Sequence, residues 1–279
     1  MMSFLEVVNK LGEKVRGSLL LIGGAEDKYG DKEILNRFCR MVQEKGSYLV
    51  VLTSAASQGA SVGLEYQRIF EDLGISEIKI LDVDCRNKAE SVENAQLLEG
   101  AGGIFFTGGD QLRITSIFGG TRVNNSLKKA YEKGTIIAGT SAGASVVSDI
   151  MIVGGKGDES AQMDSVQLSA GLGLIEELVI DQHFAQRGRM NRLLFSVAYN
   201  PHILGIGIDE DTAVEFRPEA TFVVRGSHSV TVIDGKGITH SNISEIKGKQ
   251  PLALLDVKIH VLPALYSYNL QKRKVIIPD

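Results

Sequence analysis

The stretch TIIAGTSAGAS, residues Thr135–Ser145, contains the local pattern on which the fold is built. Thr135–Ala138 is apolar or β-branched, as in a buried strand, and a helix-like run follows the glycines. Between the two lies Gly139-x-Ser141-x-Gly143, the spacing of a sharp turn from strand to helix in which small neighbours allow close approach. The stretch therefore predicts a strand, a tight turn that presents Ser141 at the edge of a sheet, and a helix.

The same alternation of short apolar strands and helical segments runs through the first two-thirds of the chain. Strands are expected at Ser18–Ile22, Tyr48–Thr53, Ile78–Val83, Gly103–Thr107, Thr135–Ala138, Leu178–Gln182 and Ile203–Ile208. Helices are expected at Lys32–Lys45, Gly63–Leu73 and Ser91–Glu99. Near-continuous apolar strands joined by amphipathic helices indicate βαβ units and a mainly parallel sheet that is covered on both faces.

After Asp209 the pattern changes to short strands. These are expected at Thr212–Phe216, Thr221–Val224, Val230–Ile233 and within Leu254–Ile277, with a turn at Arg225–His228 and an exposed loop at Ser241–Gln250. We therefore expect an α/β fold: a doubly wound, mainly parallel sheet with an antiparallel C-terminal extension, forming a single domain over residues 1–279.

The composition is that of a globular protein and excludes several classes. The chain has 30 Lys and Arg against 34 Asp and Glu, a net charge of −4, and no basic stripe that would indicate a nucleic-acid partner. Residues 1–17 lack the apolar core of a signal peptide, and no run approaches the ~18 apolar residues of a membrane span. Cys39 and Cys85 are too few for a disulfide framework, and we expect buried free thiols. A cytoplasmic protein without a membrane partner is predicted.

Polar or glycine-rich residues follow most of the predicted strands. They are Gly23–Asp27, Thr53–Ala55, Thr107–Gln111, Gly139–Ser141, Asp181–His183 and Asp209–Asp211. Because ligands of doubly wound sheets bind at the carboxyl ends of the strands, one edge of the sheet is predicted to carry the chemistry.

Ser141 is the candidate nucleophile at this edge. A strand-to-helix turn would strain its backbone and expose its hydroxyl, while the N-terminus of the following helix would favour a developing oxyanion. The alternative is an ordinary tight turn in which Ser141 caps the helix. The flanking strand and helix favour the nucleophile.

A second glycine turn, Thr107–Gln111, provides candidates for an oxyanion hole. The backbone N–H groups around Gly109 and that of Ala142 are suited to this role, and Gln111 is placed to hydrogen-bond a substrate. An equally weighted alternative is a turn that starts a helix with Asp110 as its cap. The Gly23–Gly24 turn lacks the other residues of a phosphate-binding loop, so nucleotide binding is not expected.

A nucleophilic serine needs a base, and His183 is the candidate among five histidines because it ends a strand at the predicted edge. The others are expected to be structural or exposed: His202, His228, His240 and His260. A carboxylate should orient the imidazole, and Asp209, Glu210 and Asp211 all follow a predicted strand. Spacing does not choose among these three.

Three arginines, Arg187, Arg189 and Arg192, stand where a helix is expected to begin. Cations there oppose the helix dipole at about 0.3–1 kcal/mol each, and such local conflicts are typical of functional sites. Guanidinium groups bind carboxylates in bidentate fashion, which indicates an anionic substrate. The alternative is a solvated basic face paired with surface acids.

Together these segments resemble the cyanophycinases, within the S51 serine peptidases. The matching segments are LLLIGGAEDK (Leu19–Lys28), FFTGGDQ (Phe105–Gln111), GTSAGAS (Gly139–Ser145), DQHFAQRGRMNRL (Asp181–Leu193) and GIGIDEDTA (Gly205–Ala213). They occur in the family's order over roughly the first three-quarters of the chain. The arginine-containing segment distinguishes cyanophycinases from the related α-aspartyl dipeptidases.

The resemblance implies a fold similar to class I glutamine amidotransferases, with a catalytic triad of Ser141, His183 and Glu210. It implies substrate-binding roles for Gln111, Asp181, Gln182, Arg187, Arg189 and Arg192. The family hydrolyses cyanophycin, a poly-aspartate chain with arginine on each side-chain carboxyl, to β-Asp-Arg dipeptides. It needs no metal or cofactor and is typically a homodimer.

Two rival functions fit parts of the same pattern. One is an α-aspartyl or isoaspartyl dipeptidase of the same fold, which the arginine segment disfavours. The other is a non-catalytic protein that binds an anionic ligand, which the set of serine, histidine and glutamate disfavours. Asp158 and Glu159, in the Gly154–Ser160 loop, are weak candidates for binding the guanidinium group of a substrate.

Overall fold

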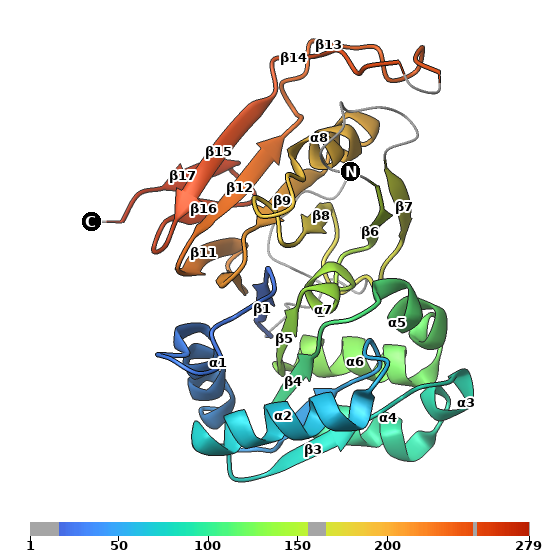
Figure 1. Ribbon diagram of the computed structural model, residues 1–279, viewed down its shortest axis with the longest axis vertical. Coiled ribbons are helices and arrows are strands. Elements are labelled where there is room, and N and C mark those ends of the chain that lie inside the picture. Colours follow the sequence, from blue (N-terminus) through green and yellow to red (C-terminus); the bar gives the residue numbers. More distant parts are fainter. Residues whose placement is uncertain (1–16, 156–165, 248–249, 279) are drawn as a thin grey trace.

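The computed structural model describes residues 17–155, 166–247 and 250–278, and its main element is a nine-stranded sheet (Figure 1). Five neighbouring strands are parallel, in the order β1 (Leu19–Ile22), β5 (Ile136–Thr140), β4 (Gly103–Phe106), β2 (Leu49–Leu52) and β3 (Ile78–Leu81). Antiparallel strands continue the sheet beyond β1: β10 (Thr212–Arg217), β11 (Thr221–Gly226), β16 (Ser267–Asn269) and β17 (Lys274–Ile276). The predicted α/β class, a mainly parallel sheet with antiparallel C-terminal strands, is confirmed.

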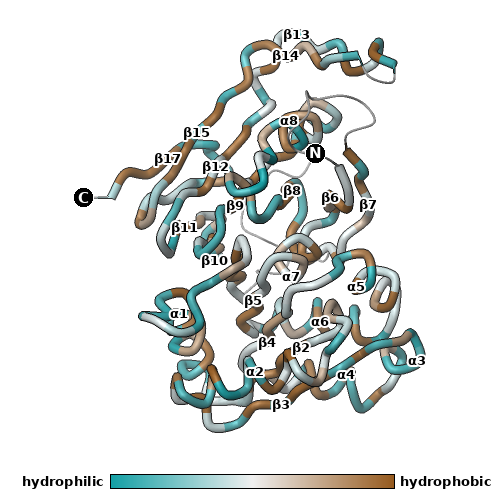
Figure 2. The backbone as a smooth tube through the Cα atoms, viewed as in Figure 1, coloured by the Kyte–Doolittle hydropathy of each residue, from teal (hydrophilic) through white to brown (hydrophobic). Residues whose placement is uncertain are grey.

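Helices cover both faces of the parallel strands, because β1, β5, β4 and β2 are buried along their whole length, whereas the edge strand β3 is half-buried and carries Lys79. On β1, Leu20 and Ile22 pack with α1 (Glu33–Gln43) and α2 (Gly59–Asp72). Leu19 and Leu21 belong to the opposite core. That face carries the helices α4 (Val92–Glu99), α5 (Gln111–Phe118) and α6 (Arg122–Lys133), with the short α3 (Arg86–Ala89) nearby. Figure 2 shows hydrophobic residues running through the strands at the centre of this sheet. The pattern is that of parallel strands buried on both faces.

A second, four-stranded sheet lies away from the α2 and β3 end of the molecule, beside the antiparallel strands of the first sheet (Figure 1). Its order is β15 (Lys258–Pro263), β12 (Ser229–Asp234), β9 (Leu204–Ile208) and β8 (Leu178–Asp181), and α8 (Met190–Tyr199) packs on it. Ile180, Ile206 and Val232 of this sheet join the same core as Leu21 and Val214 of the larger one. The two sheets therefore share a hydrophobic interior.

This arrangement corrects one expectation. The segments Leu178–Gln182 and Ile203–Ile208 were expected in the same sheet as the strand before Ser141, whereas β8 and β9 pair with each other in the smaller sheet. The physical reason is that an apolar strand followed by a helix has the same sequence pattern in either sheet. The choice depends on non-local pairing, here of β9 with β12.

Smaller elements and the cysteines complete the description. Two further pairs are β6 (Ile150–Gly154) with β7 (Gln167–Ala170) and β13 (His240–Ser241) with β14 (Leu254–Leu255). Cys39 and Cys85 are both free, as predicted, but Cys85 is exposed rather than buried because it lies just before α3 at the surface. No helix in the described ranges combines the length and apolarity that a membrane span requires.

Candidate active site

Ser141 occupies a strained turn between β5 and the short helix α7 (Ala142–Ser145). Its backbone has φ 53° and ψ −112°, a conformation that costs a non-glycine residue about 1–3 kcal/mol. The flanking glycines are required sterically. A Cβ on Gly139 would lie 2.2 Å from the carbonyl oxygen of Gly143, and one on Gly143 would lie 2.6 Å from Phe106. The Ser141 side chain makes no capping hydrogen bond to α7, so its hydroxyl is available for another partner.

That partner is His183, which in turn contacts Glu210. Ser141 Oγ lies 3.0 Å from His183 Nε2, and His183 Nδ1 lies 2.6 Å from Glu210 Oε1. Ser141 follows β5 of the nine-stranded sheet and His183 follows β8 of the four-stranded sheet. Glu210 lies in the turn from β9 to β10, where the chain passes from one sheet to the other. A hydroxyl, an imidazole and a carboxylate thus form one hydrogen-bonded chain between the two sheets.

The Gly23–Gly24 turn lies against His183. His183 donates its backbone N–H to the carbonyl oxygen of Gly23 at 2.8 Å. Gly24 has φ 98°, and a Cβ there would lie 2.3 Å from Cε1 of His183. Glycine is therefore required for the ring to lie against this turn.

The three acidic residues after β9, Asp209–Asp211, contact different partners, which their spacing in the sequence does not predict. Asp209 accepts hydrogen bonds from the N–H of Ala185 (3.0 Å) and the hydroxyl of Ser229 (2.9 Å). Asp211 accepts from the N–H of Asp27 (2.8 Å) and the hydroxyl of Ser227 (2.5 Å). Glu210 is the member that contacts His183. Its two neighbours hold the surrounding loops.

The surroundings of His183 favour the neutral imidazole that a base requires. Burial lowers the pKa of His183 below its ordinary value, and the positive charge of Arg187 lowers it further. The hydrogen bond to Glu210 opposes this shift of the His183 pKa. An imidazole with a lowered pKa is ready to accept a proton near neutral pH.

The turn before α5 lies against Ser141. A Cβ on Gly108 would be 3.6 Å from Cβ of Ser141, and one on Gly109, where φ is 148°, would collide with the carbonyl oxygen of Ala55 at 2.1 Å. Asp110 caps α5 by accepting the backbone N–H of Leu112 at 2.8 Å. Ala142 is the first residue of α7, so its N–H has no acceptor within the helix.

The arginine segment is arranged around a carboxylate of the chain itself. Asp181 is 1% exposed and accepts Nε of Arg192 at 2.6 Å, a second hydrogen bond from Nη2 of Arg192, and one from Nη1 of Arg189 at 3.4 Å. Burial lowers the pKa of Arg189 to about 10, with the charges of Arg192 and Arg187 acting in the same direction and Asp181 opposing them. Arg192 therefore makes its bidentate pair with a carboxylate of the chain itself, whereas the sequence predicted such pairing with a substrate carboxylate. Of the three arginines, Arg187 is the exposed one.

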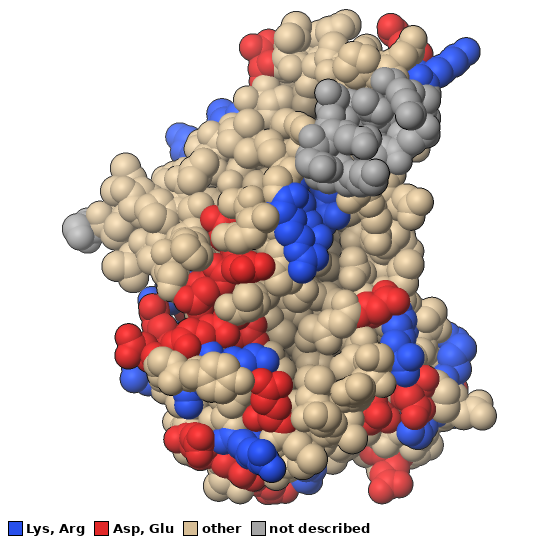
Figure 3. All heavy atoms as spheres, viewed as in Figure 1, with Lys and Arg blue, Asp and Glu red and all other residues tan. Residues whose placement is uncertain are grey.

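The two glutamines of the predicted site have different partners. Gln182 Oε1 lies 3.3 Å from Ser141 Oγ and is a second, more distant acceptor for the one hydroxyl proton that faces His183 Nε2 at 3.0 Å. Gln111 Nε2 donates to the carbonyl oxygen of Ile152 on β6 at 3.0 Å. Asp158 and Glu159 lie outside the described residues. Figure 3 shows basic side chains gathered beside the start of α8 and acidic ones across the same face toward α1.

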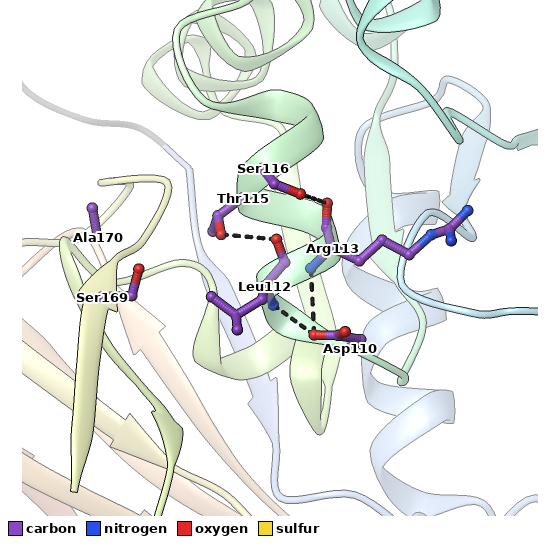
Figure 4. Close-up of a pocket in the computed structure, with 7 residues that line it drawn as sticks. All are labelled: Asp110, Leu112, Arg113, Thr115, Ser116, Ser169 and Ala170. Atoms are coloured by element: carbon purple, nitrogen blue, oxygen red, sulfur yellow. Dashed lines mark hydrogen bonds between the residues drawn. The ribbon is translucent and has the colours of Figure 1, made fainter.

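A separate pocket opens between the start of α5 and β7 (Figure 4). It is lined by Asp110, Leu112, Arg113, Thr115, Ser116, Ser169 and Ala170. The Arg113 side chain points away from Ser169 and Ala170. The pocket contains none of the predicted site residues. It adjoins the Gly108–Gly109 turn through Asp110.

Two site neighbours were not predicted from the sequence. Gln186 Oε1 accepts the backbone N–H of Glu210 at 3.0 Å, which anchors the carboxylate next to His183. Glu26 is 5% exposed and accepts the hydroxyl of Thr140, the residue before Ser141, at 2.5 Å. The sequence signals for Glu26 are its place after the Gly23–Gly24 turn and within the segment Leu19–Lys28, and neither assigns it a role. Within the described residues, no group of three or more His, Cys, Asp or Glu side chains is arranged to hold a metal ion.

Comparisons with known proteins agree on one family. The profile of peptidase family S51 matches residues 19–224. The cyanophycinase of Trichormus variabilis is 38% identical over 265 residues, which cover 95% of this chain and 89% of that protein. The cyanophycinase of Geminocystis herdmanii is 38% identical over 256 residues, covering 91% and 94%. A crystal structure of a peptidase from an acI-B1 Actinobacterium matches with a TM-score of 0.65 at 22% identity, covering 88% of this chain and 97% of that one, which shows a common fold.

Proposed function

This chain belongs to peptidase family S51 and is a serine peptidase, and we propose that it is an exopeptidase that hydrolyses cyanophycin to β-Asp-Arg dipeptides. The substrate follows from the 38% identity, over 95% of the chain, to proteins named cyanophycinase. The mechanism follows from the hydrogen-bonded chain of Ser141, His183 and Glu210. Membership of a peptidase family argues against the alternative of a non-catalytic protein that binds an anionic ligand.

In the proposed reaction, Ser141 Oγ attacks the backbone carbonyl carbon of an aspartyl residue while His183 Nε2 accepts the hydroxyl proton. The 3.0 Å separation of these two atoms allows direct transfer. Glu210, 2.6 Å from Nδ1, keeps the proton of the neutral imidazole on Nδ1 and stabilises the imidazolium that forms.

The developing oxyanion is proposed to lie near the backbone N–H groups of Gly109 and Ala142. Such preorganised donors stabilise the transition state more than the ground state. The imidazolium of His183 then gives its proton to the leaving amine, and an acyl-enzyme on Ser141 remains. Water activated by the same imidazole hydrolyses this ester and restores the serine.

Arg187 is the arginine proposed to contact a substrate carboxylate, because it is exposed and its charge reaches His183. Asp181, Arg189 and Arg192 form a buried cluster at the end of the strand that leads into Gln182 and His183. We propose that they contribute to substrate binding indirectly, by fixing the position of this strand end. Gln182 is proposed to bind substrate beside Ser141, and Gln111 to do so from the start of α5. A cytoplasmic homodimer is the proposed working form, which light scattering after size exclusion would test.

The first experiment is incubation of the purified protein with cyanophycin, with soluble products identified by mass spectrometry and Ser141→Ala in parallel. Release of β-Asp-Arg by the wild type alone is expected. If no dipeptide forms but Ser141 still reacts with a fluorophosphonate, the enzyme is a serine peptidase of other specificity, and α-aspartyl and isoaspartyl dipeptides are the next substrates. Equal activity of Ser141→Ala would refute the assignment of the nucleophile.

A further inference from the structure

Behind the nucleophile lies a buried carboxylate that the proposed reaction does not use. Glu26 follows the Gly23–Gly24 turn and is 5% exposed. One of its oxygens accepts the Thr140 hydroxyl at 2.5 Å, and the other accepts the hydroxyl of Tyr66 from α2. Each carboxylate oxygen therefore has a donor, as a buried acceptor requires.

The two donors come from different elements that meet at the reactive turn. Thr140 is the last residue of β5 and directly precedes Ser141. Tyr66 is 3% exposed, and burial, followed by the charge of Glu26, raises its pKa well above the ordinary value, so it remains a neutral donor. Lys28 Nζ lies 4.4 Å from the centroid of the Tyr66 ring and adds a positive charge nearby.

Glu26 also belongs to the segment that holds the base. Gly23 and Gly24, which contact the backbone and ring of His183, are only two or three residues before it in the chain. A single carboxylate therefore connects the segment behind His183 with the strand end that leads into Ser141. The strained backbone of Ser141 persists only if its surroundings hold it, and the hydrogen bond to Thr140 is placed to do so.

We propose that Glu26 is a positioning residue, which holds the Ser141 turn in its reactive conformation through the side chain of Thr140. The inference rests on the proposed function, because it assigns a role relative to Ser141 as nucleophile. Glu26 touches no reacting atom. Its contribution is the orientation of the attacking hydroxyl.

The sheet offers a matched control in the same row of side chains. Leu52 pairs with Phe106, and Phe106 pairs with Gly139. The residues that follow these three are Thr53, Thr107 and Thr140, which therefore lie side by side at the carboxyl ends of β2, β4 and β5. The hydroxyls of Thr53 and Thr107 are buried without a hydrogen-bond partner among the described residues. Thr53→Val therefore makes the same chemical change as Thr140→Val without removing a bond to Glu26.

The test compares the rate of fluorophosphonate labelling of Ser141, and kcat and KM, in Thr140→Val, Thr140→Ser and Thr53→Val. Thr140→Val is expected to lower the labelling rate and kcat by about 10- to 100-fold with little change in KM, since misplacement of a reacting group has effects of this size. Thr140→Ser retains the hydroxyl and should recover most of the loss. Thr53→Val should label at the wild-type rate. Thermal unfolding checks that each variant is folded.

Equal labelling rates in Thr140→Val, Thr53→Val and the wild type would overturn the inference while leaving the proposed nucleophile intact. A wild type that is neither labelled nor active would refute the proposed function and this role with it. If Thr140→Val does not fold, Tyr66→Phe takes its place, because it keeps the ring and removes the other donor to Glu26. A several-fold slower labelling is expected there, and no change would again overturn the inference.

Discussion

Among the described residues, two buried carboxylates are each bound by more than one arginine, but their surroundings differ. Glu215 on β10 is contacted by Arg37, Arg217 and Arg225, whose side chains are 33%, 43% and 23% exposed. Asp181 at the end of β8 is contacted by Arg189 and Arg192, which are only 10% and 7% exposed. The first cluster reaches water; the second is nearly dry.

The difference distinguishes an ion pair that stabilises a sheet from one that is proposed to shape the active site. Arginines that reach water keep most of their hydration, so in this cluster the desolvation falls mainly on Glu215 and not on its partners. Arg189 and Arg192 lose that hydration, and their bonds to Asp181 compensate, together with hydrogen bonds that they donate to the carbonyl oxygens of Gln182 and Gly155. Such an arrangement is costly for stability alone. Its position directly before Gln182 and His183 supplies a functional reason.

The largest effect is expected from removing the charge of the dry cluster. Asp181→Asn leaves two buried guanidinium groups without a counter-charge and should lower the free energy of unfolding by about 3–5 kcal/mol. Dipeptide release should fall with it, because the strand end that carries His183 loses its anchor. Urea unfolding measures the first effect and product analysis the second. A variant as stable as the wild type would show that the cluster is not dry in solution.

A smaller effect is expected from shortening the fork of Arg192. Arg192→Lys cannot make both hydrogen bonds to Asp181 and should lower the free energy of unfolding by about 1–3 kcal/mol. Arg225→Lys is the matched control, because Arg225 donates a single hydrogen bond to Glu215, from Nε at 3.1 Å, and is more exposed. Its effect should stay within about 1 kcal/mol. Equal losses in the two variants would remove the distinction between the clusters.

Acid unfolding tests the cluster that reaches water. Burial raises the pKa of Glu215, but the hydrogen bonds and charges of Arg37 and Arg225 outweigh it and bring the pKa to about 2, below the ordinary value of 4.5. The stabilisation that ionised Glu215 gives the folded state is therefore complete above the pKa of this carboxyl in the unfolded chain. It is lost as pH falls from there toward about 2. Glu215→Gln should show a shallower decline of stability in this window. An unchanged decline would assign acid unfolding to other carboxylates.

The smallest expected effect is a shift of the pH profile. The charge of Arg187 lowers the pKa of His183, so Arg187→Gln should raise that pKa and move the acid limb of kcat/KM to higher pH. Added salt should move the wild type in the same direction, because it screens an exposed charge. Arg217→Gln, an exposed arginine of the Glu215 cluster, should leave the limb in place. A shift to lower pH in Arg187→Gln would contradict the assignment of His183 as the base.

Many helices and strands of the fold were predictable because they depend on local sequence patterns. The expected helix Lys32–Lys45 contains α1 at Glu33–Gln43, and the expected strand Ile78–Val83 begins at the same residue as β3. Apolar periodicity and glycine turns depend on neighbours a few residues apart. The hairpin of β6 and β7 was not expected, because its strands lack a clear alternation and pair across a long connection.

For the candidate site, the sequence by itself determined which residue types stand at strand ends: a serine in a glycine turn, one well-placed histidine, an acidic triplet and an arginine segment. Their catalytic roles remain predictions that Ser141→Ala and the pH profile test. Spacing left Asp209, Glu210 and Asp211 open, the family resemblance implied Glu210, and the structure brings Glu210 to His183. Only the tertiary structure decided that Arg189 and Arg192 face Asp181 and that β8 lies in a second sheet. These contacts join residues far apart in the chain, and which side chains meet there depends on how two sheets pack.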